Sequence, residues 1–168
     1  SDKFIGGHPM CGTEKTGIKN SFAEMLDNAV FVLTPYANTN KTKLNKLIKL
    51  IKQLKMKPEI MTSKEHDEVV AAISHTPYFI AAALLQLADS QEKKTLAATG
   101  FQSTTRVGES DPCWGLDIAK TNRKAILKQL TVFQKNIKII KKLIRKKNQK
   151  KLFQFLNNSK QLRKDIYR

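Results

Sequence analysis

Cysteine is scarce in this chain of 168 residues, and acidic side chains almost disappear beyond residue 118. Cys11 and Cys113 lie far apart and outside any CxxC or Cys/His pattern, which argues against a zinc site and favours reduced thiols in the cytoplasm. No apolar run reaches 18 residues, so we expect no transmembrane helix. The N-terminal residues also lack the basic, apolar and small-residue pattern of a signal peptide.

Basic charge is concentrated at one end of the chain. Of the net charge of +17, residues 119–168 carry 17 Lys and Arg against the single acid Asp165, whereas the first 118 residues carry 14 basic and 13 acidic side chains. Lysine-rich, solvated helix faces explain this pattern, and we favour that interpretation. The alternative is a surface that attracts nucleic acid or another polyanion.

The first 61 residues have the pattern of one end of an α/β sheet. Residues 28–34 are rich in β-branched and aromatic side chains and stop at Pro35, which predicts a short buried strand. Residues 38–57 place leucine and isoleucine at helical spacing between lysines, which predicts an amphipathic helix capped by Thr39 or Asn40. Residues 58–61 are a candidate second strand. The chain has neither a GxGxxG fingerprint nor a P-loop, so it carries no dinucleotide-binding motif of its own.

A helical region follows. Thr62 and Glu65 have the spacing of a capping box, which predicts a helix over residues 64–74. Pro77 should kink or restart that helix, because proline lacks a backbone N–H. The apolar segment 79–87 should be buried against other helices or against a partner subunit.

The remaining residues predict further helices around one loop. Residues 96–112 contain two glycines and several hydroxyl side chains, which predicts a loop that carries Arg106. A long helix is expected from residue 118 onward, followed by a last helix over residues 151–166. We therefore predict a mainly α protein, with a strand-helix-strand α/β remnant over residues 1–61 and an all-helical domain over residues 62–168.

His8 stands out in the opening segment. It follows a short apolar run and two glycines, and it is the side chain there that can exchange a proton near neutral pH. A strand that delivers a histidine into a glycine-lined loop is typical of enzyme sites in α/β folds. The alternative is a strand-to-helix turn with an incidental histidine.

Three separated stretches resemble one enzyme family in their order and spacing. They are residues 6–17 (GGHPMCGTEKTG), residues 65–78 (EHDEVVAAISHTPY) and residues 99–106 (TGFQSTTR), the last followed by SDP at 110–112 and DI at 117–118. Residues 28–35 (NAVFVLTP) match that family's NA-x-x-x-LTP strand. Together these stretches resemble the C-terminal part of the prephenate dehydrogenases of tyrosine biosynthesis, over essentially the whole chain.

The resemblance implies a substrate-binding and dimerisation part that forms a homodimer through its helices. It also implies that the family's nucleotide-binding domain lies upstream and is missing here, consistent with a chain that opens abruptly on a strand. Family enzymes oxidise prephenate or arogenate at the ring carbinol, with hydride transfer to NAD or NADP and loss of carbon dioxide. We expect the isolated chain to be inactive, because most of the coenzyme site would be absent.

The resemblance also assigns site residues. His8 would accept the proton of the substrate hydroxyl, a role that suits a neutral imidazole. Arg106 would clamp a substrate carboxylate in bidentate fashion. Glu14 would lie at the mouth of the site or would simply stabilise a helix N-terminus. Further residues implied near the substrate are Tyr78, Gly100, Gln102 and His66, and Thr13 would face the coenzyme.

Several positions depart from the family pattern. Tyr78 stands where many members have a second histidine, and Gln102 and Ser103 replace a basic residue and its neighbouring acid. Trp114 lies one position before the family tryptophan, where this chain has Gly115. With these differences, the sequence does not decide whether the substrate is prephenate or arogenate.

His66 and His75 are nine residues apart, which on an unbroken helix puts them on opposite faces, so they can share a metal only if the helix breaks. We expect no metal and read His75 as a hydrogen-bonded packing residue. The other classes of function that remain open are a nucleic-acid-binding module, which the shortage of stacking aromatics among the C-terminal lysines disfavours, and a tyrosine-sensing regulatory domain.

Overall fold

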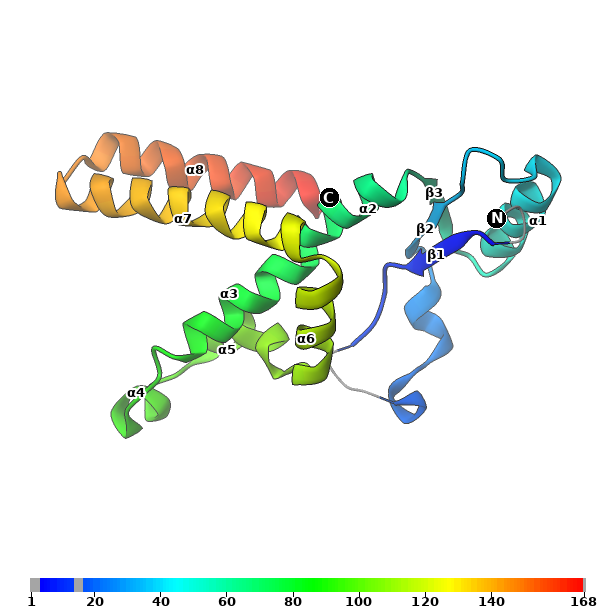
Figure 1. Ribbon diagram of the computed structural model, residues 1–168. Helices are drawn as coiled ribbons and strands as arrows, with labels where there is room; N and C mark the ends of the chain where they lie inside the picture. Colours follow the sequence, from blue (N-terminus) through cyan, green and yellow to red (C-terminus); the bar gives the residue numbers. More distant parts are fainter. Residues whose placement is uncertain (1–3, 14–16, 168) are drawn as a thin grey trace. The chain divides into compact units, whose positions relative to one another are not determined.

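The computed structural model describes residues 4–13 and 17–167, and the chain forms two compact units, residues 1–126 and residues 127–168. The predicted mainly α fold with a small sheet is confirmed (Figure 1). In chain order the elements are β1 (Gly6–Pro9), η1 (Ile18–Asn20), η2 (Ala23–Leu26), β2 (Val30–Thr34), α1 (Lys41–Gln53), β3 (Lys57–Ile60), α2 (Ser63–Val70), the π-helical turn η3 (Ala71–His75), α3 (Thr76–Leu85), α4 (Gln91–Thr95), α5 (Thr99–Thr105), the 3-10 turn η4 (Arg106–Glu109), α6 (Pro112–Thr121), α7 (Arg123–Arg145) and α8 (Gln149–Ile166).

The sheet has three strands in the order β1-β2-β3. β1 runs antiparallel to β2, with His8 opposite Val32, and β2 runs parallel to β3. The two glycines and His8 therefore lie inside a strand, although the sequence suggested that the strand would end before them. Gly7 is required there, because a Cβ at this position would lie 2.7 Å from the ring of Phe31 on the neighbouring strand.

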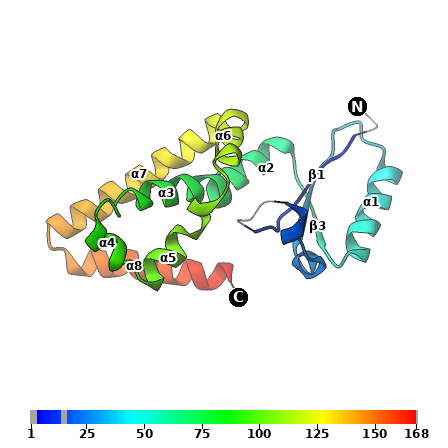
Figure 2. The same ribbon diagram turned by 90° about the horizontal axis from the view of Figure 1, so that it is seen from below.

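The sheet and α1 share the first core. Leu33 of β2 and Ile51 of α1 are 0% and 1% exposed, and Met56, just before β3, packs with them. Figure 2 shows α1 beside the strands. The predicted amphipathic helix is thus confirmed, and Asn40 rather than Thr39 is its N-cap, because the Asn40 side chain accepts a hydrogen bond from the Lys43 N–H.

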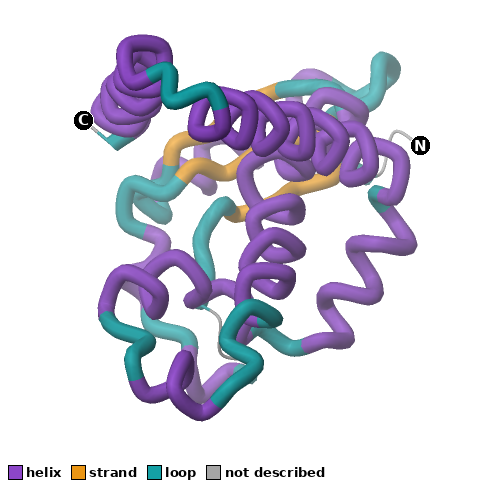
Figure 3. Tube along the Cα trace, turned by 90° about the vertical axis from the view of Figure 1, so that its left-hand side faces the viewer, coloured by secondary structure: helices purple, strands orange, loops and turns teal. Residues whose placement is uncertain are grey.

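α2, η3 and α3 form one continuous helical stretch with a π-helical turn in its middle. Figure 3 shows that helices make up most of the chain and strands a small part of it. The capping box is confirmed: the Thr62 hydroxyl accepts from the Glu65 N–H, and the Glu65 carboxylate accepts from the Thr62 N–H. Pro77 has no N–H to donate to Ile73, and the preceding turn widens so that the Thr76 N–H donates to the Ala71 carbonyl. The proline therefore produces a π-helical turn instead of ending the helix.

This stretch, Ser63–Leu85, is long and apolar enough to cross a membrane by length and composition alone. Three of its residues, Val70, Ala71 and Ala81, are nevertheless 2%, 0% and 2% exposed inside the first unit. A helix that packs into the core of a globular unit passes the same test, so the composition is only a weak indication of a membrane helix.

Two predictions for the following segment are wrong. Residues 99–105 form α5 rather than a loop, and hydroxyl side chains hydrogen-bond to carbonyls inside this helix: Thr104 donates to the Gly100 carbonyl and Thr105 to the Phe101 carbonyl. The expected long helix from residue 118 is two helices, because the backbone leaves helical geometry at Asn122, with φ −120° and ψ 31°. The last predicted helix is confirmed as α8.

The second unit consists of α8 and most of α7, and none of its described side chains is buried. In Figure 2 the two helices diverge from the turn that connects them. Apolar side chains such as Val132, Ile144 and Leu156 are 45%, 59% and 55% exposed. Exposed apolar side chains that recur along both helices are a candidate interaction surface.

Replacing Ile51 by alanine should lower the free energy of unfolding by about 2–5 kcal/mol, because the cavity left in the first core cannot close fully. The neighbouring Leu50 is 51% exposed on the same helix, so Leu50→Ala should cost less than about 1 kcal/mol. Urea unfolding followed by circular dichroism measures both values. Equal losses in the two variants would contradict the core assignment.

Candidate functional site

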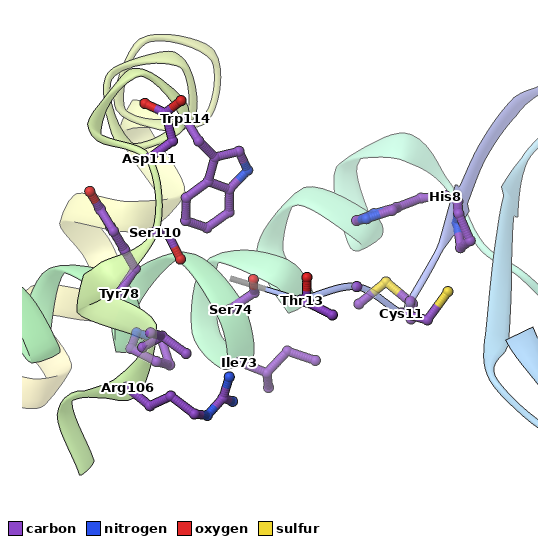
Figure 4. A pocket seen from close by; sticks show the side chains of 15 residues that line it. His8, Cys11, Thr13, Ile73, Ser74, Tyr78, Arg106, Ser110, Asp111 and Trp114 are labelled. Carbon is purple, nitrogen blue, oxygen red and sulfur yellow. The ribbon is translucent and has the colours of Figure 1, made fainter. Parts of the chain in front are cut away.

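A cavity of about 550 Å³ lies within the first unit. It is lined by β1 and the loop after it, by the end of η3 and the first turn of α3, and by the segment from η4 to the first turn of α6. Figure 4 shows His8 on one side of this cavity and Tyr78, Arg106 and Trp114 on the other. Three sequence stretches that lie far apart along the chain therefore surround one space.

His8 enters the cavity from β1, where pairing with β2 fixes the direction of its side chain. Partial burial of the ring lowers the pKa of His8 below 6.5, and the nearby His66 lowers the pKa further. His8 is therefore neutral at pH 7 and has one ring nitrogen free to accept a proton. A neutral histidine at the edge of a cavity is suited to general-base chemistry.

His66 supports His8 from outside the cavity. The distance between His8 Nδ1 and His66 Nε2 is 2.9 Å, and the two rings meet edge to face with centroids 5.1 Å apart. On its other side His66 Nδ1 lies 3.0 Å from the Asp67 carboxylate. His66 does not line the cavity, so the structure brings it to His8 rather than directly to a substrate.

The π-helical turn changes the relation between His66 and His75 that an unbroken helix would impose. His75 lies close to His66, His8 and Asp67, because all three influence its pKa. Burial lowers the pKa of His75, and its ring packs edge-on against Trp114 at 6.0 Å. The Asn122 amide nitrogen lies 3.4 Å from His75 Nδ1 and donates to the Asp67 carbonyl at 2.7 Å, so His75 has the packing role that the sequence suggested.

Lowered pKa values at His8 and His75 make stability depend on pH. The unfolded chain binds protons at these positions near pH 6.5, whereas the folded chain binds them only at lower pH. The unfolded state therefore carries more protons in this window. The free energy of unfolding should fall as the pH drops below about 6.5.

Arg106 follows α5 directly, at the start of η4, and lines the cavity opposite His8. It also borders a second cavity of about 730 Å³, whose lining includes Gln102 and Ser103. Helix α5 and η4 thus hold Arg106 at the boundary between two spaces. A guanidinium at such a position can bind a carboxylate that enters either one.

Tyr78 and Trp114 form an aromatic wall. Their rings meet edge to face, with centroids 5.1 Å apart and an interplanar angle of 87°. Gly115 makes this wall possible, because a Cβ at residue 115 would lie 2.6 Å from the Tyr78 hydroxyl. The tyrosine ring at residue 78 therefore fits only because residue 115 has no side chain.

The structure brings together part of the predicted site. His8, Thr13, Tyr78 and Arg106 line the 550 Å³ cavity, and Glu14 lies outside the described residues. Gln102 lines the second cavity. Gly100 lines neither, and its carbonyl accepts hydrogen bonds from Ser103 and Thr104.

Other lining residues received no role from sequence reasoning. Asp111 caps α6 by accepting a hydrogen bond from the Cys113 N–H, and it places Ser110 and Trp114 at the cavity. The Asp-Pro pair at 111–112 is a helix-start signal from which this placement can be found. Within residues 4–13 and 17–167, no three His, Cys, Asp or Glu side chains form a group that could hold a metal ion.

Two family models match consecutive parts of the chain. The nucleotide-binding domain of prephenate dehydrogenase matches residues 1–60, and the dimerization domain of prephenate dehydrogenase matches residues 62–158. The chain belongs to the prephenate dehydrogenase family. The predicted family is thereby confirmed.

Individual relatives agree with this membership. The prephenate dehydrogenase of Bacillus subtilis is 31% identical over 166 residues, which are 96% of this chain and 45% of that protein. The structure of an Aquifex aeolicus prephenate dehydrogenase in complex with hydroxyphenyl propionate and NAD+ superposes with a TM-score of 0.90, 29% identity, and coverage of 98% of this chain and 59% of that one.

The crystal structure of the Synechocystis arogenate dehydrogenase has a TM-score of 0.86 and 33% identity, and covers 97% of this chain and 61% of that chain. The chain thus spans about half the length of the relatives it matches. Family members with different substrate names share this fold.

Replacing Gly115 by alanine should destabilise the fold by about 1–3 kcal/mol, because the new methyl group displaces Tyr78. Gly100→Ala in α5 is the matched control, since a Cβ there meets no atom within 4 Å and alanine favours a helix by about 1 kcal/mol. Urea unfolding compares the two variants. If Gly115→Ala is as stable as Gly100→Ala, Tyr78 does not occupy the position described.

Proposed function

We propose that this chain is the substrate-binding and dimerisation part of a prephenate dehydrogenase, which converts prephenate to 4-hydroxyphenylpyruvate by NAD-dependent oxidative decarboxylation. The observation that carries the proposal is the presence of His8 and Arg106 in the lining of one cavity. The family membership supplies the reaction class. We expect the enzyme to work in the cytoplasm, as suits a step of tyrosine biosynthesis.

His8 and Arg106 supply complementary chemistry. Prephenate carries two carboxylates and a ring hydroxyl. Arg106 would hold one carboxylate through paired N–H donors and orient the ring toward β1. The neutral imidazole of His8 would accept the hydroxyl proton while hydride leaves the same carbon, which makes the oxidation easier. The aromatic wall of Tyr78 and Trp114 would pack against the ring and limit access of water.

The coenzyme site would include the glycine-rich loop of the family's nucleotide-binding domain, a motif that residues 1–168 lack. When bound, the nicotinamide coenzyme supplies the hydride acceptor. The loop after β1 fits one edge of that site, because Gly12 borders open space and Thr13 lines the cavity beside His8. The choice between NAD and NADP depends on the part of the enzyme that carries the glycine-rich loop.

Arogenate is the second candidate substrate. The Synechocystis relative is an arogenate dehydrogenase that is 33% identical to this chain. Arogenate differs from prephenate by an amino group in its side chain. Gln102 and Ser103 replace the family's basic residue and its neighbouring acid, which are groups that discriminate a charged side chain. Turnover assays with each purified substrate distinguish the two.

Joined in one chain to the nucleotide-binding domain of the Bacillus subtilis relative, residues 1–168 should reduce NAD when prephenate is present. His8→Asn should lower kcat about 100- to 10,000-fold, since a general base contributes that much. Arg106→Ala should raise KM by about 30-fold or more through loss of a charged pair. The KM of Arg106→Lys should lie between that of the parent enzyme and that of Arg106→Ala.

Arg145→Ala, in the last turn of α7, is the matched control and should leave both constants unchanged. NADH absorbance and carbon dioxide release report the reaction. Unchanged turnover in His8→Asn removes the proposed base, and an unchanged KM in Arg106→Ala removes the carboxylate clamp. Residues 1–168 alone should bind hydroxyphenyl propionate in calorimetry without reducing NAD.

We also propose that the apolar stripes of α7 and α8 form the interface of a homodimer. The match to a dimerization domain supports this, as do the exposed Ile144, Leu156 and Leu162. The lysines between these positions are then solvated at the rim of the interface and keep the dimer in solution. This arrangement gives the lysines of the C-terminal helices a role that requires no nucleic-acid partner.

The chain should sediment as a dimer at micromolar concentration in analytical ultracentrifugation. Leu156→Asp should weaken the dimer at least about 30-fold, because a charge would be buried in the interface. Gln154→Asp introduces the same charge on the opposite face of α8 and should leave the dimer intact. A monomeric parent chain would contradict the proposal.

A further inference from the structure

Three side chains form a hydrogen-bonded series that begins at the lining of the cavity. His8 borders the cavity, its Nδ1 lies 2.9 Å from His66 Nε2, and His66 Nδ1 lies 3.0 Å from the Asp67 carboxylate. The His66 side chain is 19% exposed and the Asp67 side chain 54% exposed, and His8 at the cavity is itself exposed. The series therefore joins β1 at the cavity to the first turns of α2.

The Asp67 carboxylate determines which ring nitrogens of His66 and His8 carry protons. An ionised carboxylate only accepts hydrogen bonds, so His66 must carry its proton on Nδ1 and present a bare Nε2. That bare nitrogen can only accept, so His8 must donate from Nδ1. The Nε2 of His8 is then unprotonated, which is the state that a general base in the cavity needs.

The same series has a preferred place for an incoming proton. Like charges on adjacent imidazoles repel, and besides burial the nearby His66 lowers the pKa of His8. Asp67 contacts His66 but no hydrogen bond joins it to His8, so its negative charge favours the proton on His66. Asp67 is also held from behind, because the Asn122 side chain donates to its backbone carbonyl at 2.7 Å.

We propose that Asp67 and His66 are positioning residues that set the tautomer of His8 and receive the proton that His8 takes from the substrate. The proposal rests on the base role of His8 under the proposed function. In the step, the substrate O–H bond breaks as an N–H bond forms at His8 Nε2. The Nδ1–H bond of His8 then breaks as an N–H bond forms at His66 Nε2, which leaves an imidazolium beside the Asp67 carboxylate.

Other titratable groups near His8 come from several elements. His75 on η3 is close enough for His8 to influence its pKa, and Cys11 lies on the loop after β1. Arg106 and Asp111 line the cavity on the side of η4 and α6. Among the described residues, Asp67 is the carboxylate in direct contact with a histidine of the series.

The first test is nitrogen NMR on the isolated 168-residue chain, which has three histidines. At pH 7.5, His8 and His66 should both carry their protons on Nδ1, whereas histidine in water prefers Nε2. Asp67→Asn should return at least one ring to the Nε2–H form. As a control, Asp89→Asn removes a negative charge that is paired with Lys93, and it should leave the tautomers of His8 and His66 unchanged.

An Nε2–H tautomer at His8 in the parent chain overturns the proposal whether or not the enzyme oxidises prephenate. The two hypotheses therefore fail independently. Assignments come from His66→Gln and His75→Gln spectra, and an unchanged amide spectrum outside α2 shows that each variant is folded.

The second test uses the chain joined to a nucleotide-binding domain. Asp67→Asn should lower kcat about 10- to 100-fold, the size of the loss when a metal-bound histidine loses the carboxylate that orients it, with KM within about 3-fold. The acid limb of the kcat/KM profile should move to lower pH, because the imidazolium formed on proton uptake would lose the negative charge beside it. Asp67→Glu should restore the limb, and His66→Gln, which keeps an acceptor for His8, should retain more activity than His66→Phe. An acid limb that stays in place in Asp67→Asn overturns the relay.

Discussion

The antiparallel pairing of β1 with β2 is the interaction on which the site depends. It makes His8 a strand residue with a fixed direction, opposite Val32, instead of a residue in a flexible loop. β2 in turn pairs with β3, and the chain passes from the end of β3 at Ile60 to the cap of α2 at Thr62. Because this connection is so short, the first turn of α2 must lie beside the sheet, and His66 meets His8 there.

The second constraint comes from Pro77. A proline inside a helix removes one backbone hydrogen bond, and here the preceding turn widens to accommodate the loss. The widened turn places Ile73 and Ser74 in the wall of the cavity. π-helical turns are often found at functional sites, and in this chain the wide turn is what lets one continuous helical stretch serve both the histidine series and the cavity.

The aromatic wall shows how neighbouring positions depend on one another. Gly115 leaves the space that the Tyr78 hydroxyl fills. Trp114 packs edge to face against both Tyr78 and His75. A change at residue 115 therefore reaches the cavity through Tyr78.

Local patterns in the sequence determined the helices and strands wherever short-range physics decides them. The capping box at Thr62, the amphipathic spacing of α1 and the β-branched run of β2 are examples, because each depends on residues within a few positions. The motifs around His8, His66 and Arg106 also identified the family. Tertiary structure decided the rest. Residues 99–105 form α5 despite their glycine and hydroxyl residues, and α5 packs against α3. Asn122 breaks the long helix while its side chain bonds to Asp67, 55 residues away. His8 and His66, which are 58 residues apart in the sequence, are in contact, and no pattern of neighbouring residues predicts a contact over that separation.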